Sequence, residues 1–227
     1  MQFWHVMLRA CSGVVSIPGV ELGGVGGALE AFTDAAGGSA DSPGNGTGGV
    51  LGAWWFYVPW SVRIRAGGWR VDGLKVSRKL SALELVGPLV VVAAAAELVR
   101  NRRLVIWVDN AGSVAIWKKG YSNKCRLCTT LVAAIAAVAA AVGCAVELRK
   151  VTRCSDVGSQ LADHLSKGNF RECRQLAQEV SWPLVVEPAR LPAALVRWID
   201  RPEPDRELGH RILEELAQER PILSYSV

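Results

Sequence analysis

The stretch LVIWVDNAGSV, residues 104–114, decides how the chain is interpreted. Its first five residues are large or β-branched and apolar, a pattern that predicts a buried central strand rather than an amphipathic surface element. Asp109 follows at the carboxyl end of that strand. A carboxylate is costly to bury alone, and this edge of an open α/β sheet is where ligand and metal sites are commonly found. Asp109 is therefore a candidate site residue if other carboxylates join it.

The composition allows one sizeable domain with appendages, or two small domains, since 50% of the 227 residues are hydrophobic. Lysine and arginine outnumber aspartate and glutamate by 26 to 21. The excess is concentrated in residues 61–126, where thirteen basic residues stand against four acidic ones. Such a segment suits a polyanion such as nucleic acid, although a solvated basic surface gives the same count.

The six cysteines are spread along the chain without the dense spacing of a disulfide framework, and no N-terminal segment has the charged start and small-residue cleavage site of a signal peptide. We therefore expect an intracellular protein, in the cytoplasm, the nucleus or both. Cys125 and Cys128 form a C-x-x-C pair, but no second pair stands at zinc-finger spacing. We interpret them as two residues on one turn of a helix.

An uncharged segment, residues 127–146, is long enough to cross a bilayer. Many of its residues are Ala, Gly or Thr, which are weakly hydrophobic, and no aromatic belt flanks it. The segment is better explained as an alanine-rich helix that packs closely against a sheet and ends near Gly143. We expect no membrane partner.

Periodicity and turn residues predict strands that alternate with helices. Strands are expected at residues 29–35, 50–58, 61–71 (as the pieces 61–65 and 69–71), 104–109 and 144–151, and helices at residues 81–100, 111–118, 127–143, 157–166, 170–180, 191–199 and 207–220. This order predicts an α/β protein with a five-stranded mixed sheet flanked by helices. Ser81 and Glu84 match a capping box at the start of the first long helix, which also contains Pro88.

Acidic residues stand on separate elements of this predicted fold. They are Asp34 at the end of the first strand, Glu84 in the first long helix, Asp109 after the fourth strand and Asp163 in the helix after the fifth. Each has a structural explanation alone, as a turn, cap or surface residue. Together, two carboxylates about 4 Å apart repel by about 4 kcal/mol at an effective dielectric near 20. Hard divalent cations with oxygen ligands would relieve that repulsion.

The segments AFTDAAGG, SALELVGPL, VDNAGSVAIWKKG and QLADHLSKG resemble, in order and spacing, the motifs of ribonuclease H domains. The likeness is nearest to the domains that follow the reverse transcriptase in retroelements, particularly the tyrosine-recombinase retrotransposons. It implies a ribonuclease H-like fold over residues 29–168. It also implies that Asp34, Glu84, Asp109 and Asp163 are catalytic and hold two Mg²⁺ ions, for which Mn²⁺ can substitute.

By the same resemblance the protein is expected to be an endoribonuclease that cleaves the RNA strand of an RNA–DNA hybrid. Its expected partners are the hybrid and a reverse transcriptase domain of the same polyprotein. Candidate substrate contacts are Asn110, Lys118, Lys119, Lys124, Arg126 and Arg153. Many such domains carry a histidine in the loop before the last acid, where this chain has Arg153, so turnover could be slower or use another proton carrier.

Outside the resemblance, residues 1–28 are predicted to be a tether rich in glycine, and residues 169–227 a helical C-terminal extension. No catalytic cluster is evident in this extension. The alternative to a nuclease is a module of the same fold that is weakly active or inactive and binds nucleic acid or a protein partner. Cleavage of a hybrid with Mg²⁺ distinguishes the two.

Overall fold

Strands from both halves of the chain form one mixed sheet in the computed structural model. The structure describes residues 27–37, 45–60, 76–153, 155–184, 191–200 and 206–218. The strands are β1 (Leu29–Ala35), β2 (Gly46–Leu51), β3 (Trp54–Pro59), β4 (Arg103–Val108) and β5 (Ala145–Lys150), in the spatial order β3-β2-β1-β4-β5. β2 is antiparallel to β1 and β3, whereas β1, β4 and β5 are mutually parallel. The predicted five-stranded mixed sheet is confirmed.

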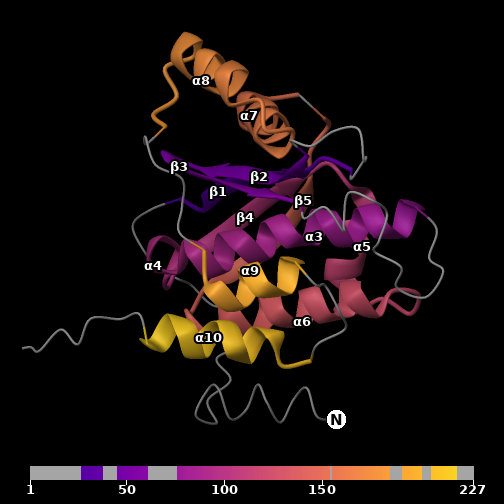
Figure 1. Cartoon of the computed structure of the whole chain (residues 1–227). Helices are drawn as coiled ribbons and strands as arrows, with labels where there is room; N and C mark the ends of the chain where they lie inside the picture. The colour runs from indigo at the N-terminus through magenta and orange to yellow at the C-terminus, as the bar shows by residue number, and fades with distance from the viewer. Residues whose placement is uncertain are drawn as a thin grey trace, which may run out of the picture.

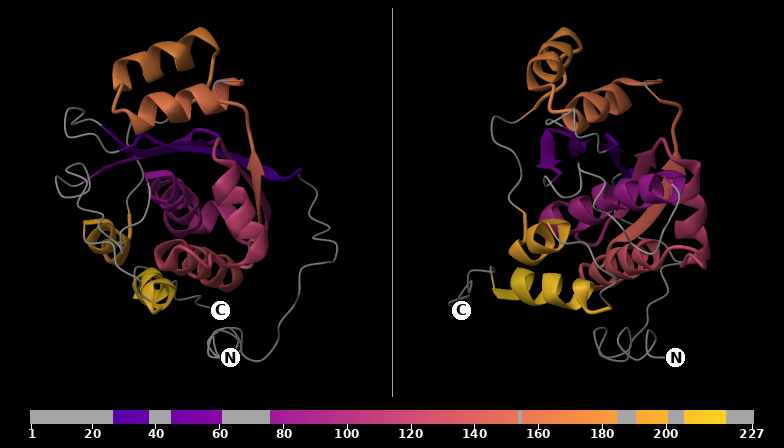
Figure 2. Two further views of the ribbon diagram at one scale, coloured as in Figure 1. Left: turned by 90° about the vertical axis from the view of Figure 1, so that its right-hand side faces the viewer. Right: turned by 45° about the vertical axis from the view of Figure 1, so that its right-hand side comes forward.

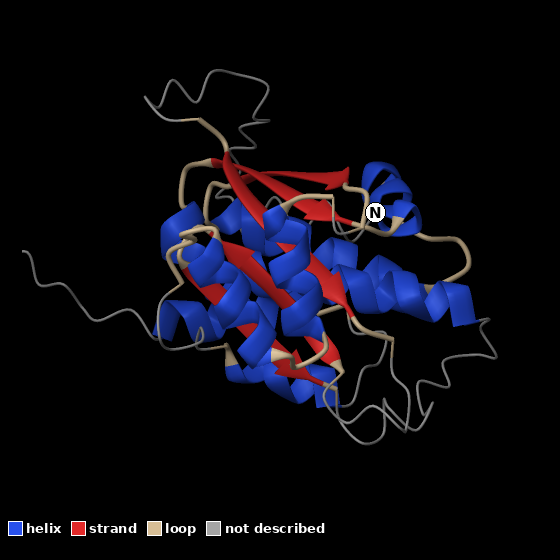
Figure 3. Ribbon diagram, turned by 90° about the horizontal axis from the view of Figure 1, so that it is seen from above, coloured by secondary structure: helices blue, strands red, loops and turns tan. Residues whose placement is uncertain are grey.

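Helices cover both faces of the sheet (Figure 1). They are α3 (Val76–Ala94), α4 (Ala96–Val99), α5 (Ala111–Lys119), α6 (Arg126–Ala141), α7 (Val157–Ser166), α8 (Phe170–Glu179), α9 (Ala193–Asp200) and α10 (Leu208–Gln218). α7 and α8 lie on one side, and α3, α5 and α6 on the other (Figures 1 and 2). Seen from above, the strands fan out between the helices (Figure 3). The arrangement is a ribonuclease H-like one, with helices at the C-terminus.

The glycine-rich strand β2 was not predicted. The stretch expected to be a single strand, residues 50–58, contains the end of β2, a turn at residues 52–53 and most of β3. The third strand expected at residues 61–71 lies outside the described residues. Glycine is unfavourable in strands, but Gly48 makes room for α7, because a Cβ atom there would lie 2.5 Å from the Cβ of Leu165. Close packing of the helix therefore outweighs local propensity.

The capping box predicted at Ser81 and Glu84 is wrong, because α3 begins at Val76. The residues from Val76 to Leu80 contain no helix breaker, so the helix extends by more than a turn toward the N-terminus. Ser81 instead lies inside the helix, where its hydroxyl donates to Oδ1 of Asn110 at 3.3 Å. Glu84 therefore lies inside α3 and does not cap its N-terminus.

The alanine-rich helix α6 packs between other helices of the protein. It packs against α3 on one side and α10 on another, and Figure 2 shows α6 and α10 side by side. A Cβ atom on Gly209 of α10 would lie 3.1 Å from the Cα of Ala134, so small residues let the two helices approach. Across the part of the chain that the structure describes, no helix combines the length and apolarity that a membrane span requires.

The C-terminal helices contribute to the main core, which contains the buried side chains of Leu195, Trp198, Leu208 and Ile212. α8 instead packs on α7, on the opposite face of the sheet. The described helices after residue 169 therefore lie on both sides of the sheet. The division into a tether, a domain of residues 29–168 and an extension stays a prediction, and residues 1–26 of the tether lie outside the described residues.

Candidate metal centre

Parallel pairing of β1 with β4 brings two strand-end acids to one edge of the sheet. Phe32 pairs with Trp107, so two residues farther along each strand Asp34 and Asp109 come level. Asp34 is the last but one residue of β1, and Asp109 directly follows β4. β1 and β4 are neighbours in the sheet, and both acids lie at its carboxyl edge, where ligand sites are common.

Glu84 reaches the same edge because α3 lies very close to β1. Gly87, three residues after Glu84, faces Thr33: a Cβ atom on Gly87 would lie 2.7 Å from the Cβ of Thr33, closer than such atoms approach. Glycine permits this approach because it has no side chain. Since Thr33 precedes Asp34, the contact brings Glu84 to Asp34.

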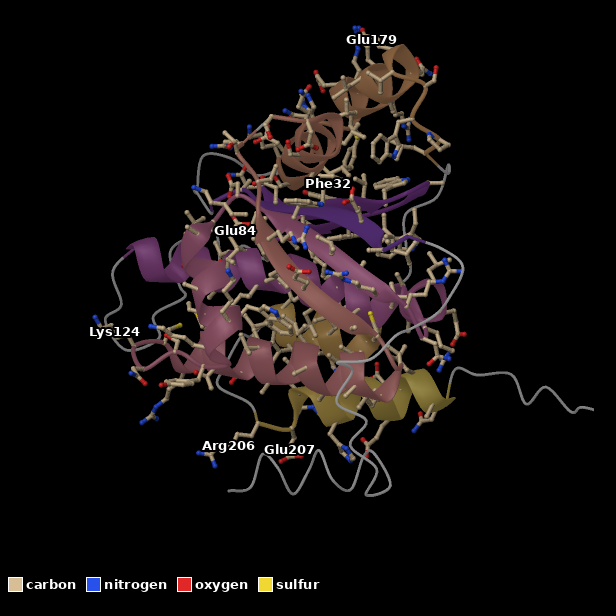
Figure 4. All side chains as sticks on the ribbon, turned by 180° about the vertical axis from the view of Figure 1, so that it is seen from behind. Phe32, Glu84, Lys124, Glu179, Arg206 and Glu207 are labelled. Carbon is tan, nitrogen blue, oxygen red and sulfur yellow. The ribbon has the colours of Figure 1, made fainter. Side chains whose placement is uncertain are left out.

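Asp34, Glu84 and Asp109, called the acid group below, each offer a carboxylate oxygen within 4.8 Å of the others. Asp34 and Glu84 are buried, with 7% and 3% of their surface exposed. Asp109 is partly exposed. Figure 4 shows Glu84 beside the edge of the sheet. The group could hold a metal ion, and Asp109 lies on its solvent side.

Among the three acids, Glu84 has the environment least favourable to a charged carboxylate. Burial raises its pKa well above the ordinary value, and the charges of Asp34 and Asp109 and a hydrogen bond shared with Asp109 raise it further. Its Oε2 atom is buried and has no hydrogen-bond partner. Native proteins rarely leave a buried polar atom unpaired. A cation bound between these carboxylates would give this oxygen a partner.

Asp34 is held on two sides by hydroxyl groups. The buried Ser166 of α7 donates to its Oδ2, and Thr47 of β2 donates to its backbone carbonyl at 3.1 Å. Burial raises the pKa of Asp34; the Ser166 hydroxyl opposes this, and nearby Asp109 and Asp163 add to it, so that the net pKa is raised. α7 thus orients a carboxylate that β1 supplies.

The cap of α5 is Asn110 and not Asp109. The Asn110 Oδ1 atom accepts from the backbone N–H of Ser113 at 3.0 Å and from the Ser81 hydroxyl. Asp109 is therefore left free for the acid group. The predicted contact between Asn110 and a ribose has to use its Nδ2 group, because Oδ1 is already engaged.

Asp163 is not part of the acid group. Its side chain is paired with Arg153 at 2.8 Å and with Lys167 at 2.6 Å. Burial alone would raise the pKa of Asp163, but hydrogen bonds from Lys167 and Arg153 outweigh it, and the net pKa is lowered. Of the four predicted catalytic acids, the structure brings three together and holds the fourth beside them.

The basic residues predicted to contact substrate are exposed. Lys118 and Lys119 lie in the last turn of α5, and Lys124 and Arg126 lie just before and at the start of α6. Figure 4 shows Lys124 at the margin of the molecule. Their exposure leaves them available to a polyanion, and their contact with a substrate stays a prediction.

The sequence analysis did not single out Ser166 and Lys167, which both contact the predicted acids. Both stand in the quoted segment QLADHLSKG, three and four residues after Asp163. That spacing places side chains on one face of a helix. Helical spacing from Asp163 was therefore the signal that could have found them.

The C-x-x-C pair lies on one helix turn, as predicted. Cys125 is the N-cap of α6, and its sulfur accepts from the backbone N–H of Cys128. Both cysteines are buried, and neither is part of a disulfide bond. The hydrogen bond with Cys125, and then burial, raise the pKa of Cys128. Both side chains pack into the main hydrophobic core.

No protein-family model, no curated protein and no solved structure matches the chain. A functional proposal therefore depends on the geometry of the acid group and not on a relative of known activity.

Proposed function

We propose that the protein is a metal-dependent endoribonuclease that hydrolyses the RNA strand of RNA–DNA hybrids. The observation that supports this most strongly is the convergence of Asp34, Glu84 and Asp109 at the carboxyl edge of the sheet, with a buried Glu84 oxygen that lacks a partner. The order of the acids along the chain and the ribonuclease H-like fold agree with the proposal.

In this proposal Asp34, Glu84 and Asp109 hold Mg²⁺, for which Mn²⁺ can substitute, and a second ion is expected as in other phosphodiester hydrolases. Bound Mg²⁺ supplies a water of lowered pKa and neutralises charge on the phosphate. The protein's own residues fix the carboxylates: Gly87 brings Glu84 to Asp34, and Ser166 orients Asp34.

Substrate contact in this proposal depends on the exposed basic residues and on Asn110. Lys118, Lys119, Lys124 and Arg126 would bind the phosphate backbone, which dominates affinity for nucleic acids. Asn110 follows Asp109 in the chain, and its Nδ2 group would donate to a ribose 2′-hydroxyl, the group that distinguishes RNA from DNA. The setting is reverse transcription in a retroelement, inside the cell, beside a polymerase domain of the same polyprotein.

A labelled RNA–DNA hybrid incubated with the protein and Mg²⁺ tests the proposal. We expect cleavage of the RNA strand, and a loss of about a hundredfold or more in Asp109→Asn, which removes one ligand. Glu147→Gln is the matched control, because Glu147 is a surface acid of β5 that pairs with Arg103 and Arg149. Absence of cleavage, or equal losses in both variants, would contradict the proposal.

A second candidate is a binding module of the same fold without useful activity. The pairing of Asp163 with Arg153 and Lys167 favours it, because a neutralised acid is less available to a cation. Tight binding of the hybrid without cleavage in either Mg²⁺ or Mn²⁺ would establish the module and exclude the enzyme.

A further inference from the structure

The side chain of Asp163 lies between two cations. Arg153 donates to Oδ1 from Nη2 at 2.8 Å and from Nε at 3.3 Å, and Lys167 donates to Oδ2 from Nζ at 2.6 Å. The Asp163 side chain is 11% exposed, whereas the side chains of Arg153 and Lys167 are 59% and 38% exposed. Both oxygens of one carboxylate are thus held by cations that solvent reaches.

The two cations suit a phosphate as well as they suit a carboxylate. An arginine fork binds the paired oxygens of either group, and a lysine adds a point charge. Ion pairs of exposed cations contribute little to stability, so exchanging one anion for another costs little. A phosphodiester that replaced Asp163 would keep both cations neutralised.

The position of the pair relates it to the acid group. β5 is parallel to β4, so the loop that follows β5 and contains Arg153 leaves the sheet at the same edge as Asp109. Asp34 and Asp109 both interact electrostatically with Arg153. Lys167 follows Ser166, the residue that donates to Asp34. A strand bound at the acid group would therefore meet Arg153 and Lys167.

We propose that Arg153 and Lys167 form the binding site for a backbone phosphate of the nucleic acid, a site that Asp163 occupies when no strand is bound. This inference rests on the proposed function, since it concerns the same substrate at the same edge. When the phosphate replaces Asp163 between the two cations, the Asp163 carboxylate is released. This carboxylate already lies near enough to Asp34 to interact with it electrostatically. The fourth acid thus joins the acid group when substrate is bound.

A double-mutant cycle in EDTA tests the site without catalysis. Affinity for an RNA–DNA hybrid is measured by fluorescence anisotropy for the wild type, Asp163→Asn, Lys167→Met and the double variant. Asp163→Asn is expected to raise the affinity about fivefold or more, because the competing anion is removed. In the Lys167→Met background the same change is expected to raise it less than about twofold.

Asp109→Asn is the matched control, since it removes a carboxylate at the same edge that does not contact Lys167. Any gain it gives from reduced repulsion should persist in the Lys167→Met background. Equal gains from Asp163→Asn with and without Lys167 would overturn the site. The proposal would also be overturned if inorganic phosphate bound Asp163→Asn to saturation while the variant gained no affinity for the hybrid. Arg153 and Lys167 would then bind small phosphates rather than the nucleic acid backbone.

The inference and the proposed function fail in different ways. If the wild type cleaves the hybrid with Mg²⁺ and the cycle shows no coupling, the phosphate site is excluded and the nuclease stands. If the wild type binds no hybrid in EDTA at any salt concentration down to about 50 mM, the phosphate site is excluded together with the hybrid as substrate.

Discussion

Two kinds of carboxylate meet at one edge of the sheet, and they differ in their partners. Among the described residues, Asp34, Glu84 and Asp109 face one another within 4.8 Å, and Glu84 keeps a buried oxygen without a partner. Asp163, close by, is held by two cations. Sequence alone made the four acids equivalent. The acid group could hold a metal ion, whereas Asp163 is already paired with two cations of the protein.

The two kinds should respond to pH in opposite directions. The folded-state pKa values of Glu84 and Asp34 are raised, so their contribution to stability is complete below pH ~4 and is lost as the pH rises through the folded values. The folded-state pKa of Asp163 is lowered, so its contribution is present above pH ~4 and is lost as the pH falls.

The largest expected effect is on metal affinity when a member of the acid group is neutralised. Glu84→Gln keeps the shape of the side chain but removes a charged ligand, and we expect Mn²⁺ affinity to fall by about a hundredfold or more. Isothermal titration calorimetry with Mn²⁺ measures it. Affinity within about threefold of the wild type would mean that Glu84 is not a ligand.

A smaller loss of Mn²⁺ affinity is expected when the Ser166 hydroxyl, which orients Asp34, is removed. Ser166→Ala deletes the donor to Asp34 Oδ2, and we expect Mn²⁺ affinity to fall by about 10- to 100-fold, as for other groups that hold a ligand. Thr47→Val is the control, because Thr47 is equally buried but donates to the backbone of Asp34. Similar metal affinities in the two variants would show that Ser166 has a purely structural role.

A moderate gain in stability is expected for the metal-free protein when Glu84 is neutralised. In EDTA at pH 8, Glu84→Gln should raise the melting temperature by about 2–4 °C, which corresponds to about 1 kcal/mol for a chain of this size. At pH 4 the gain should vanish, because the wild-type carboxyl is then protonated. Calorimetry at both pH values provides the measurement, and a gain that is equal at both would exclude relief of repulsion as its cause.

The smallest effect is expected at Asp163. Asp163→Asn should change Mn²⁺ affinity in the absence of nucleic acid by less than about threefold, because its carboxylate is engaged with Arg153 and Lys167. It should lower the free energy of unfolding at pH 7 by about 0.5–1 kcal/mol, since both cations are well exposed. A loss of metal affinity as large as that of Glu84→Gln would remove the distinction between the two kinds of acid.

The strands and helices with a clear hydrophobic period were predictable. β1 and α7 have the expected bounds, and β4 and α5 differ by a residue. These elements placed Asp34 and Asp109 at strand ends, and the parallel pairing of β1 with β4 in the structure brings the two acids to one edge. Local pattern and tertiary packing agree in this part of the molecule.

Other features depend on contacts between distant segments and could not be predicted. β2 pairs with β1 and β3 despite its glycines, and Gly48 lets α7 pack closely over it. The small residues of α6 likewise let α10 approach. The pairing of Asp163 with Arg153 also depends on the fold, since Arg153 lies in a loop ten residues away. Lys167, by contrast, stands at helical spacing from Asp163. Propensity alone carries no information about such partners.

A crystal structure of the protein soaked in Mn²⁺, with anomalous data, tests the central claim most directly. The account predicts an anomalous peak bound by oxygens of Asp34, Glu84 and Asp109 in the absence of nucleic acid, with Asp163 still paired to Arg153 and Lys167. Crystals that show no peak at this group at millimolar Mn²⁺, with the three carboxylates still facing one another, would contradict it.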